Sequence, residues 1–194
     1  MPRIYYALIS NLEASILGLI CEGFRYGYEL DKVIDERNMR HWTEIGFSSI
    51  YYVLKRLEKN GLITSGREQV NGRSRKVYQV TPLGEAEMKS KVIGLVSNYN
   101  PVTDPFDLGV GNLQRLTYEE MMTGLKSYRL SLDTQEQFYL KRLNVMHESE
   151  WPPHIRGLVT RPLAKLDAEK KWVESYIDEL EALHKAKEKT HVSQ

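Results

Sequence analysis

A change of hydrophobic period in the first half of the chain limits what it can fold into. Between residues 47 and 60 the apolar side chains recur every three to four positions, which is typical of a helix with one buried face. Leu62, Ile63 and Thr64 are expected to form a short strand, and residues 76–80 alternate apolar and polar, as strands do. Asn71 and Gly72 lie between them, and this pair favours the tight turn of a β-hairpin. The segment therefore predicts a helix followed by a two-stranded hairpin.

Further helices surround this segment, and two of them carry start signals. Ser10 and Glu13 form a capping-box pattern, in which the hydroxyl and the carboxylate satisfy free backbone amides at a helix start. Thr81 followed by Pro82 is a second start signal, with proline in the first turn. The expected helices span about residues 10–23, 26–38, 47–60 and 81–97. Together with the hairpin, they predict one compact unit.

Prolines and glycines gather at residues 99–116, where we place a linker. Its middle, residues 106–110, is apolar and is expected to pack against another part of the protein. A long helix follows to about His147, and a last helix contains Pro162, which should kink it or mark its start. The polar end, residues 185–194, is expected to fray.

These elements predict a mainly α fold. It combines an α+β winged helix-turn-helix domain with a two-stranded wing and an all-α antiparallel helical domain. The expected boundaries are 1–98 for the winged domain with its N-terminal arm, 99–116 for the linker and 117–194 for the helical domain. With 41% hydrophobic and 27% charged residues, the composition is ordinary for a globular protein. The short apolar runs, the start without a secretory signal and the single Cys21 favour a cytoplasmic protein with no membrane partner.

One face of the helix expected at residues 47–60 carries groups that bind nucleic acid. At about 100° per residue, the apolar side chains cluster on one side, the expected core face: Phe47, Ile50, Leu54 and Leu57. The other side carries hydroxyls and cations: Ser48, Ser49, Tyr52, Lys55, Arg56 and Lys59. Hydroxyls bind phosphates or base edges, and arginine pairs bidentately with guanine. We therefore interpret this helix as the DNA-reading helix.

A basic hairpin adjoins that helix in the sequence. Arg73, Arg75 and Lys76 place three cations beside the turn, where no core requires them. Residues 40–76 contain eight Lys or Arg and three Glu, a local charge of +5 in a chain whose net charge is +1. Such a patch attracts phosphates, so we assign these three cations to a wing that contacts double-stranded DNA. For the patch taken alone, a solvated charged face is the alternative.

The two long helices carry apolar stripes that need a partner. Their large aromatic side chains exceed what a two-helix hairpin buries, which favours an intermolecular bundle in a homodimer. The residues assigned to dimerisation are Leu125, Tyr128, Leu132, Tyr139, Leu143, Trp172, Tyr176 and Leu180. The apolar arm at residues 4–8 is expected to lie against the partner. Two alternatives stay open: the stripes close on each other within one chain, or the helices fold onto the winged domain of a monomer.

Five segments, taken in order, resemble the PadR family of winged-helix regulators. They are residues 12–19, 26–30, 49–63, 72–78 and 81–84, which read LEASILGL, YGYEL, SIYYVLKRLEKNGLI, GRSRKVY and TPLG. Residues 117–184 are similar in length and helical pattern to the dimerising domain of the AphA-like subgroup. Many relatives have Pro-Gly before the reading helix, where this chain has Ser48 and Ser49.

The resemblance implies a sequence-specific transcriptional regulator. It implies a two-fold homodimer on a palindromic operator, usually a repressor, and a small-molecule effector that weakens DNA binding and that the sequence does not identify. The alternative is a winged-helix protein-interaction module without DNA binding, although such a module has no need of a basic wing.

An enzyme is not expected from these residues. The five histidines lack zinc-site spacing, and neither a phosphate loop nor a nucleophile elbow is present. Cys21 falls in an apolar helix and is expected to be inert packing. The sequence therefore assigns no catalytic residue, no metal site and no cofactor.

Overall fold

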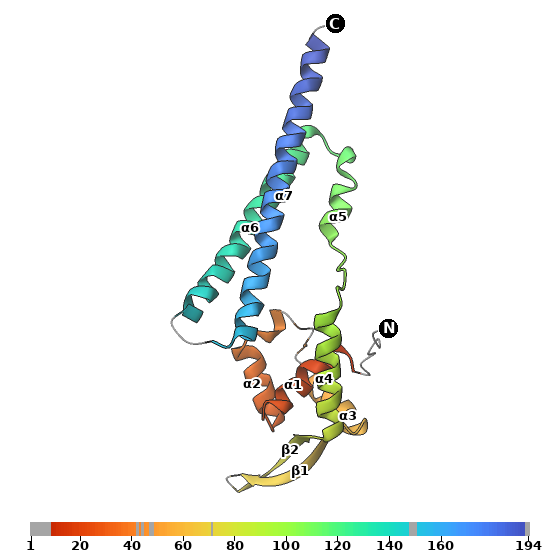
Figure 1. Cartoon of the computed structure of the whole chain (residues 1–194), viewed down its shortest axis with the longest axis vertical. Helices are drawn as coiled ribbons and strands as arrows, with labels where there is room; N and C mark the ends of the chain where they lie inside the picture. Colours follow the sequence, from red (N-terminus) through yellow and green to blue (C-terminus); the bar gives the residue numbers. More distant parts are fainter. Residues whose placement is uncertain are drawn as a thin grey trace. The chain divides into compact units, whose positions relative to one another are not determined.

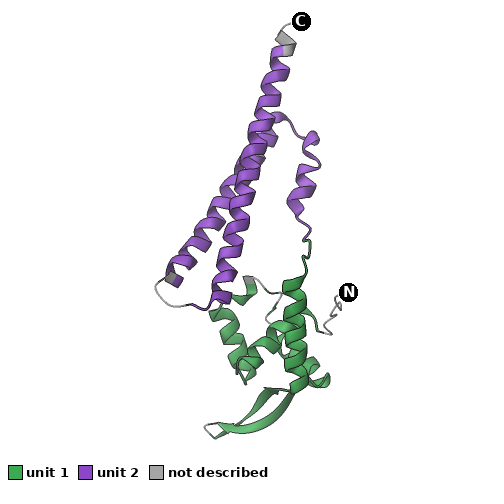
Figure 2. Cartoon of the chain, in the orientation of Figure 1, with its two compact units in different colours: residues 1–101 green, residues 102–194 purple. Residues whose placement is uncertain are grey.

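The protein divides into two compact units. The structure is a computed structural model that describes residues 9–41, 43, 45–46, 49–70, 72–147 and 151–192. Unit 1 comprises residues 1–101 and unit 2 comprises residues 102–194 (Figure 2). The arm at residues 4–8, together with Phe47, Ser48 and Asn71, lies outside the described residues.

The described part of unit 1 is a winged helix, as the sequence predicts (Figure 1). Its elements are α1 (Asn11–Cys21), α2 (Gly27–Glu36), the 3-10 turn η1 (Met39–His41), α3 (Ile50–Lys59), β1 (Ile63–Val70), β2 (Arg73–Val80) and α4 (Pro82–Ser97). The strands β1 and β2 pair antiparallel and form the wing. The predicted helix–hairpin–helix order is therefore confirmed.

The start signals read from the sequence act at the ends of helices. The Glu13 backbone N–H donates to the Ser10 hydroxyl at 3.2 Å, and the Ser10 N–H donates to the Glu13 carboxylate at 2.9 Å. At α4 the Gly84 N–H donates to the Thr81 hydroxyl at 3.0 Å. After α1, Gly23 has a φ of 105°, a conformation that costs little because glycine has no Cβ.

The core of unit 1 forms where α1, α2, α3 and the wing meet. From α1, Ile16 and Leu17 are fully buried. The buried side chains of α3 are Ile50, Val53, Leu54 and Leu57. Val53 was not assigned to the core face, and its burial widens the apolar side of this helix. Burying one such side chain contributes about 1.5–3 kcal/mol, so the core fixes which side of α3 faces outward.

The wing is longer than the sequence predicts. Its register runs from Ile63 opposite Val80 to Val70 opposite Arg73, so each strand has eight residues. The expected first strand ended at Thr64, because the residues after it are mostly polar and exposed. Backbone pairing with β2 extends β1, and backbone pairing leaves no mark in the hydrophobic pattern. Gly72 in the turn has a φ of 73°, as a tight hairpin turn requires.

The described part of unit 2 consists mainly of two long helices that lie side by side (Figure 1). Its elements are α5 (Pro105–Val110), the 3-10 turn η2 (Leu113–Arg115), α6 (Tyr118–His147) and α7 (Pro153–Val192). Pairing is antiparallel: Lys126 of α6 faces Glu181 of α7 at 3.7 Å, and Glu136 faces Lys170 at 2.7 Å. This agrees with the predicted antiparallel all-α domain.

The last helix is longer than the sequence predicts. Pro162 lies inside α7, so of the two expected roles, a kink or the start of the helix, it does not have the second. The expected fraying from Lys185 is also not observed, since α7 continues to Val192. Charged side chains one helical turn apart support this end, among them Glu181 and Lys185.

The apolar stripes of α6 and α7 close on each other within the chain. Leu125, Leu132 and Val173 are buried at the centre of this cluster. The partly buried side chains around them are Phe106, Met121, Tyr128, Leu166, Tyr176, Ile177 and Leu180. Five residues assigned to dimerisation, namely Leu125, Tyr128, Leu132, Tyr176 and Leu180, therefore pack inside one chain. These five residues therefore form the seam within one chain that the sequence left open as an alternative.

The expected linker contains structure that belongs to unit 2. Residues 102–116 fall in unit 2, and α5 lies within them. The Phe106 ring stacks on Tyr128, with ring centroids 3.9 Å apart, and meets Trp172 edge-on at 5.9 Å. The apolar middle of the segment thus packs on α6 and α7.

None of the helices in the described ranges combines the length and the apolar composition that a membrane-spanning segment needs.

Candidate nucleic-acid interface

The outward face of α3 presents an aromatic hydroxyl and three cations. Tyr52 is 62% exposed, and Lys55, Arg56 and Lys59 are exposed as well. Because Ile50, Val53, Leu54 and Leu57 are buried on the opposite side, the helix cannot rotate without exposing the core. The structure therefore brings four of the sequence-assigned residues together on one solvent-facing surface.

The two serines before α3 contribute differently. Ser49 is half-buried, and its hydroxyl donates to the Gly46 carbonyl at 2.7 Å, so it supports the turn that precedes α3. Its oxygen still has room to accept a hydrogen bond from a partner. Ser48 lies outside the described residues.

Tyr51 is a candidate that the site assignment left out. It lies next to Tyr52 at the start of α3, and 66% of it is exposed. Its ring edge rests against Gly27 of α2, where an added Cβ would come within 2.8 Å of the ring. One edge of Tyr51 thus closes the seam between α2 and α3 while most of the ring faces solvent beside Tyr52. Two adjacent tyrosines at a helix start are the signal that could have identified it.

The cations of the wing divide between its two faces. In an antiparallel pair, opposite residues share a face and neighbours along a strand alternate. Lys76 lies opposite Arg67, so both are on one face of the wing, and Lys76 contacts Glu58 of α3 from that face. Arg75 lies on the other, where its guanidinium sits 4.9 Å from the ring centroid of Tyr28. Arg73 is exposed next to the turn, and the exposed Arg67 is a cation that the site assignment missed.

Glu58 connects the reading helix to the wing. Its Oε1 accepts a hydrogen bond from the Ser65 hydroxyl of β1, and its Oε2 accepts one from Lys76 Nζ of β2 at 2.9 Å. The Ser65 hydrogen bond and then Lys76 lower the pKa of Glu58, and the bond to Glu58 raises the pKa of Lys76. Lys76 therefore braces the wing against α3, besides its position near the proposed DNA surface.

This brace predicts a pH-dependent contribution to stability. Replacing Glu58 with glutamine should lower the free energy of unfolding by about 0.5 kcal/mol at neutral pH, a small value because a third of the side chain is exposed. Because the folded pKa of Glu58 is lowered, its contribution is complete above the ordinary value of 4.5 and disappears as the pH falls through the folded pKa. The raised pKa of Lys76 means that the contribution also fades as the pH rises above 10.5.

Urea unfolding of wild type and Glu58→Gln from pH 3 to pH 7 measures this difference. On a background that carries Ser65→Ala and Lys76→Met, the same Glu58→Gln change should have little effect at any pH. A stability difference that stayed constant down to pH 3 would show that the carboxylate charge does not contribute.

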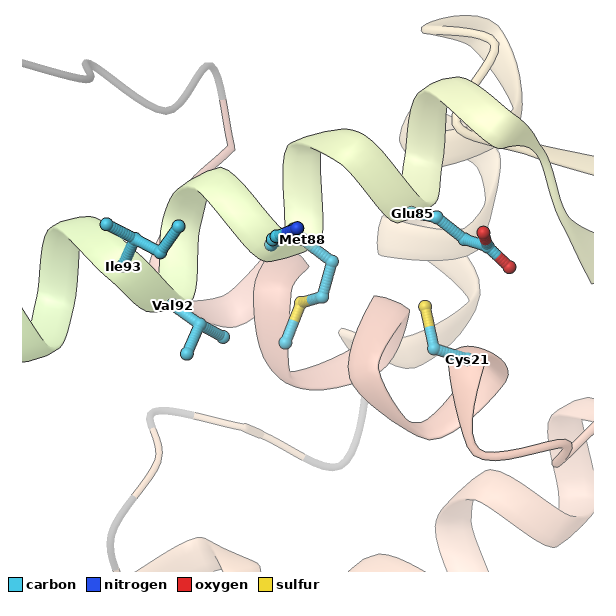
Figure 3. A pocket seen from close by; sticks show the side chains of 6 residues that line it. Cys21, Glu85, Met88, Val92 and Ile93 are labelled. Carbon is cyan, nitrogen blue, oxygen red and sulfur yellow. The ribbon is translucent and has the colours of Figure 1, made fainter.

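A shallow hollow beside α4 contains the cysteine (Figure 3). Its volume is about 400 Å³, and it is lined by Cys21, Glu85, Met88, Lys89, Val92 and Ile93. Cys21 is exposed, not packed in the core as expected, because it is the last residue of α1. Partial burial, with Glu85 nearby, raises the pKa of the Cys21 thiol. A raised thiol pKa is the opposite of what a cysteine nucleophile requires.

The geometry of unit 1 defines a class of protein. A three-helix core places one helix with a polar outward face next to a two-stranded basic hairpin, and this combination is the winged helix-turn-helix arrangement. Unit 2 adds a long antiparallel helical pair.

Comparison with known proteins gives the family. The Transcriptional regulator PadR-like family matches residues 16–90. Uncharacterized protein X of Lysinibacillus sphaericus is 34% identical over 105 residues, which is 54% of this chain and 92% of that protein. This chain belongs to the PadR-like family, whose members are transcriptional regulators and not enzymes.

Solved structures share the fold over most of the chain. One of them is Bacillus subtilis PadR in complex with operator DNA. It matches with a TM-score of 0.69 and 23% identity, over 87% of this chain and 98% of that one. Bacillus subtilis PadR was also solved in complex with p-coumaric acid. That structure matches with a TM-score of 0.72 and 23% identity, over 89% of this chain and 99% of that one. The structure of the Vibrio cholerae virulence activator AphA matches with a TM-score of 0.67 and 17% identity, over 89% of this chain and 99% of that one. These likenesses establish the winged-helix fold with its helical second unit.

Proposed function

We propose that this chain is a sequence-specific DNA-binding regulator that acts as a homodimer on a palindromic operator. The observation that carries the proposal is the outward face of α3, with Tyr52, Lys55 and Arg56, next to a wing that carries Arg73 and Arg75. A helix of this width fits the major groove, where hydroxyls and arginine read base edges. A basic wing adds contacts to the phosphate backbone. The PadR structure with operator DNA supports the same use of the shared fold.

The two parts of the surface have different tasks. Side chains on α3 discriminate between bases, because their donors and acceptors meet groups that differ from base to base. Wing cations contribute affinity for any sequence, because every phosphate carries the same charge. The glutamate brace between α3 and the wing keeps the two in register.

Selection from a pool of random duplexes tests the proposal. The full chain is immobilised, bound duplexes are amplified over several rounds, and the enriched sequences are read. We expect a recurrent motif whose two halves are inverted repeats, since a two-fold dimer presents two copies of α3. Retention of duplexes without any recurrent motif, or no retention, would favour a winged-helix module that binds protein.

We further propose that dimerisation uses the outer side of α6. The intrachain seam leaves Leu130, Phe138 and Val145 exposed by 67%, 39% and 60%, and their spacing places them on one side of the helix. Trp172 of α7, assigned to dimerisation from the sequence, is 44% exposed and stays available. Tyr139 and Leu143 are half-buried. A second copy on the outer side of α6 would cover Leu130, Phe138 and Val145 from water, which favours association.

Replacing Leu130 and Val145 together with glutamate should convert the dimer to a monomer. On association the two glutamates would lose their hydration and gain no opposite charge, which is costly. The dissociation constant of the dimer should therefore rise at least about a hundredfold. Size-exclusion chromatography with light scattering gives the mass directly. Leu116→Glu, at an exposed leucine before α6, is the matched control and should remain dimeric. A double variant that keeps the wild-type mass would place the dimer contact elsewhere.

We propose repression as the regulatory outcome and a small molecule as the signal. Operator-bound and p-coumaric-acid-bound PadR structures support both for a chain with this fold. Fusion of the selected operator to a reporter gene tests repression: deletion of the gene for this chain should raise reporter output.

A further inference from the structure

Glu13 is a buried carboxylate that faces the reading helix. Only 2% of the residue is exposed. Its Oε2 accepts a hydrogen bond from the Ser10 backbone N–H at 2.9 Å and completes the capping box of α1. Its Oε1 lies 3.1 Å from Nε of Arg56 on α3. The cap needs only the first of these contacts, so the second has another role.

Arg56 carries the cation that accompanies the buried carboxylate of Glu13. Among the described residues, Oε1 has no aligned hydrogen-bond donor, and the cation of Arg56 is the charge that lies beside it. Burying a carboxylate is costly unless an opposite charge accompanies it. A neutral glutamine in this place would still offer an oxygen to the Ser10 N–H. The charge of Glu13 therefore serves the contact with α3 and not the cap.

This contact restricts the guanidinium of Arg56. A guanidinium is planar and holds its five donors in a fixed fork, so attraction between Nε and the carboxylate of Glu13 limits the positions that the whole group can take. Tyr52, one helical turn earlier, lies under it, with the guanidinium carbon 6.0 Å from the ring centroid. The Arg56 side chain is 49% exposed, and its two terminal amino groups are free of the Glu13 contact. They are the donors that reach a partner outside.

We propose that Glu13 is a positioning residue that sets base preference by fixing Arg56. The inference rests on the proposed DNA-binding function. An arginine whose charge is offset by a carboxylate contributes less to general attraction of phosphates, whereas an oriented pair of amino groups suits a base edge that offers two acceptors. Guanine, with O6 and N7, is that base. The expected target of Arg56 is therefore one guanine in each half of the operator.

Glu13→Gln tests this in the full chain. The probes are the duplex enriched by selection, its single-base-pair variants and a random-sequence duplex of the same length. We expect discrimination at one base pair per half-site to fall about tenfold. Binding of the random duplex should not weaken, because a negative charge has been removed. Glu22→Gln, at the C-cap of the same helix, makes the same change in net charge and should leave discrimination intact.

Two further variants separate positioning from structural damage. On an Arg56→Ala background, Glu13→Gln should cause no further loss of discrimination, and Arg56→Lys, which keeps the charge but lacks the fork, should resemble Arg56→Ala. Equal weakening of selected and random duplexes by Glu13→Gln would show a structural role only and overturn the proposal. Full discrimination in Glu13→Gln would overturn it as well. Failure of the proposed function is distinguishable, because wild type itself would then show no preference among the duplexes.

Discussion

Replacing Gly84 with alanine is expected to lower the free energy of unfolding of unit 1 by about 3 kcal/mol. Gly84 lies in the first turn of α4, packed against the start of the wing. An added Cβ would come within 2.1 Å of the Leu62 carbonyl oxygen and 3.0 Å of Val80 Cγ2. The carbonyl cannot move away cheaply, because the Thr81 backbone N–H and hydroxyl both donate to it. The helix must therefore shift off the wing.

Chemical denaturation followed by circular dichroism measures this loss. Gly66→Ala in β1 is the matched control, since its Cβ would lie 3.8 Å from Val77 Cγ1, an ordinary contact. The control should change stability by less than about 1 kcal/mol. If Gly84→Ala unfolded at the same denaturant concentration as wild type, the tight approach of α4 to the wing would be wrong.

Changing Arg73 and Arg75 together to alanine is expected to weaken binding to every duplex alike. Each lost phosphate contact reduces the slope of log affinity against log salt by roughly one, so the pair should reduce it by about two. Near 0.1 M salt this corresponds to a loss of between roughly tenfold and a hundredfold. Arg75 loses its stacking on Tyr28 as well, which adds mobility to the wing.

Fluorescence anisotropy titrations of the selected and the random duplex at several salt concentrations give both slopes. Lys32→Ala with Lys89→Ala removes the same charge from exposed positions of unit 1 outside α3 and the wing, and should change the slope little. Tyr52→Ala, by contrast, should reduce discrimination between sequences. An identical uniform loss for Tyr52→Ala and for the wing variant would show that α3 is not the reading helix.

The sequence predicted the local elements of unit 1 because their signals are local. Ser10 with Glu13 and Thr81 with Pro82 mark helix starts within a few residues, and each forms the cap that its pattern indicates. The outward face of α3 follows from helical geometry once its core side is known. The exposed part of the wing was missed beyond Thr64, because backbone pairing has no side-chain pattern.

Contacts between distant residues were not predictable in this way. The capping box fully accounted for Glu13, so nothing in the sequence indicated its ion pair with Arg56, 43 positions later. The sequence likewise indicated only that Lys76 is a cation of the wing, and not that Glu58 lies beside it. An apolar stripe on a helix also does not specify its partner. The stripe that contains Leu125 and Leu132 therefore fits a second chain and the same chain equally well, and the sequence does not indicate that Val173 packs against it within one chain.

The salt dependence of duplex binding by the full chain tests the central claim most directly, namely that the exposed side of α3 and the adjacent wing form a DNA-binding surface. Affinity should fall steeply as salt rises from about 0.05 to 0.2 M, with a slope set by the number of phosphates contacted. At every salt concentration the affinity for the selected duplex should exceed the affinity for the random one. No binding at 0.05 M salt, or binding that does not change with salt, would contradict the claim.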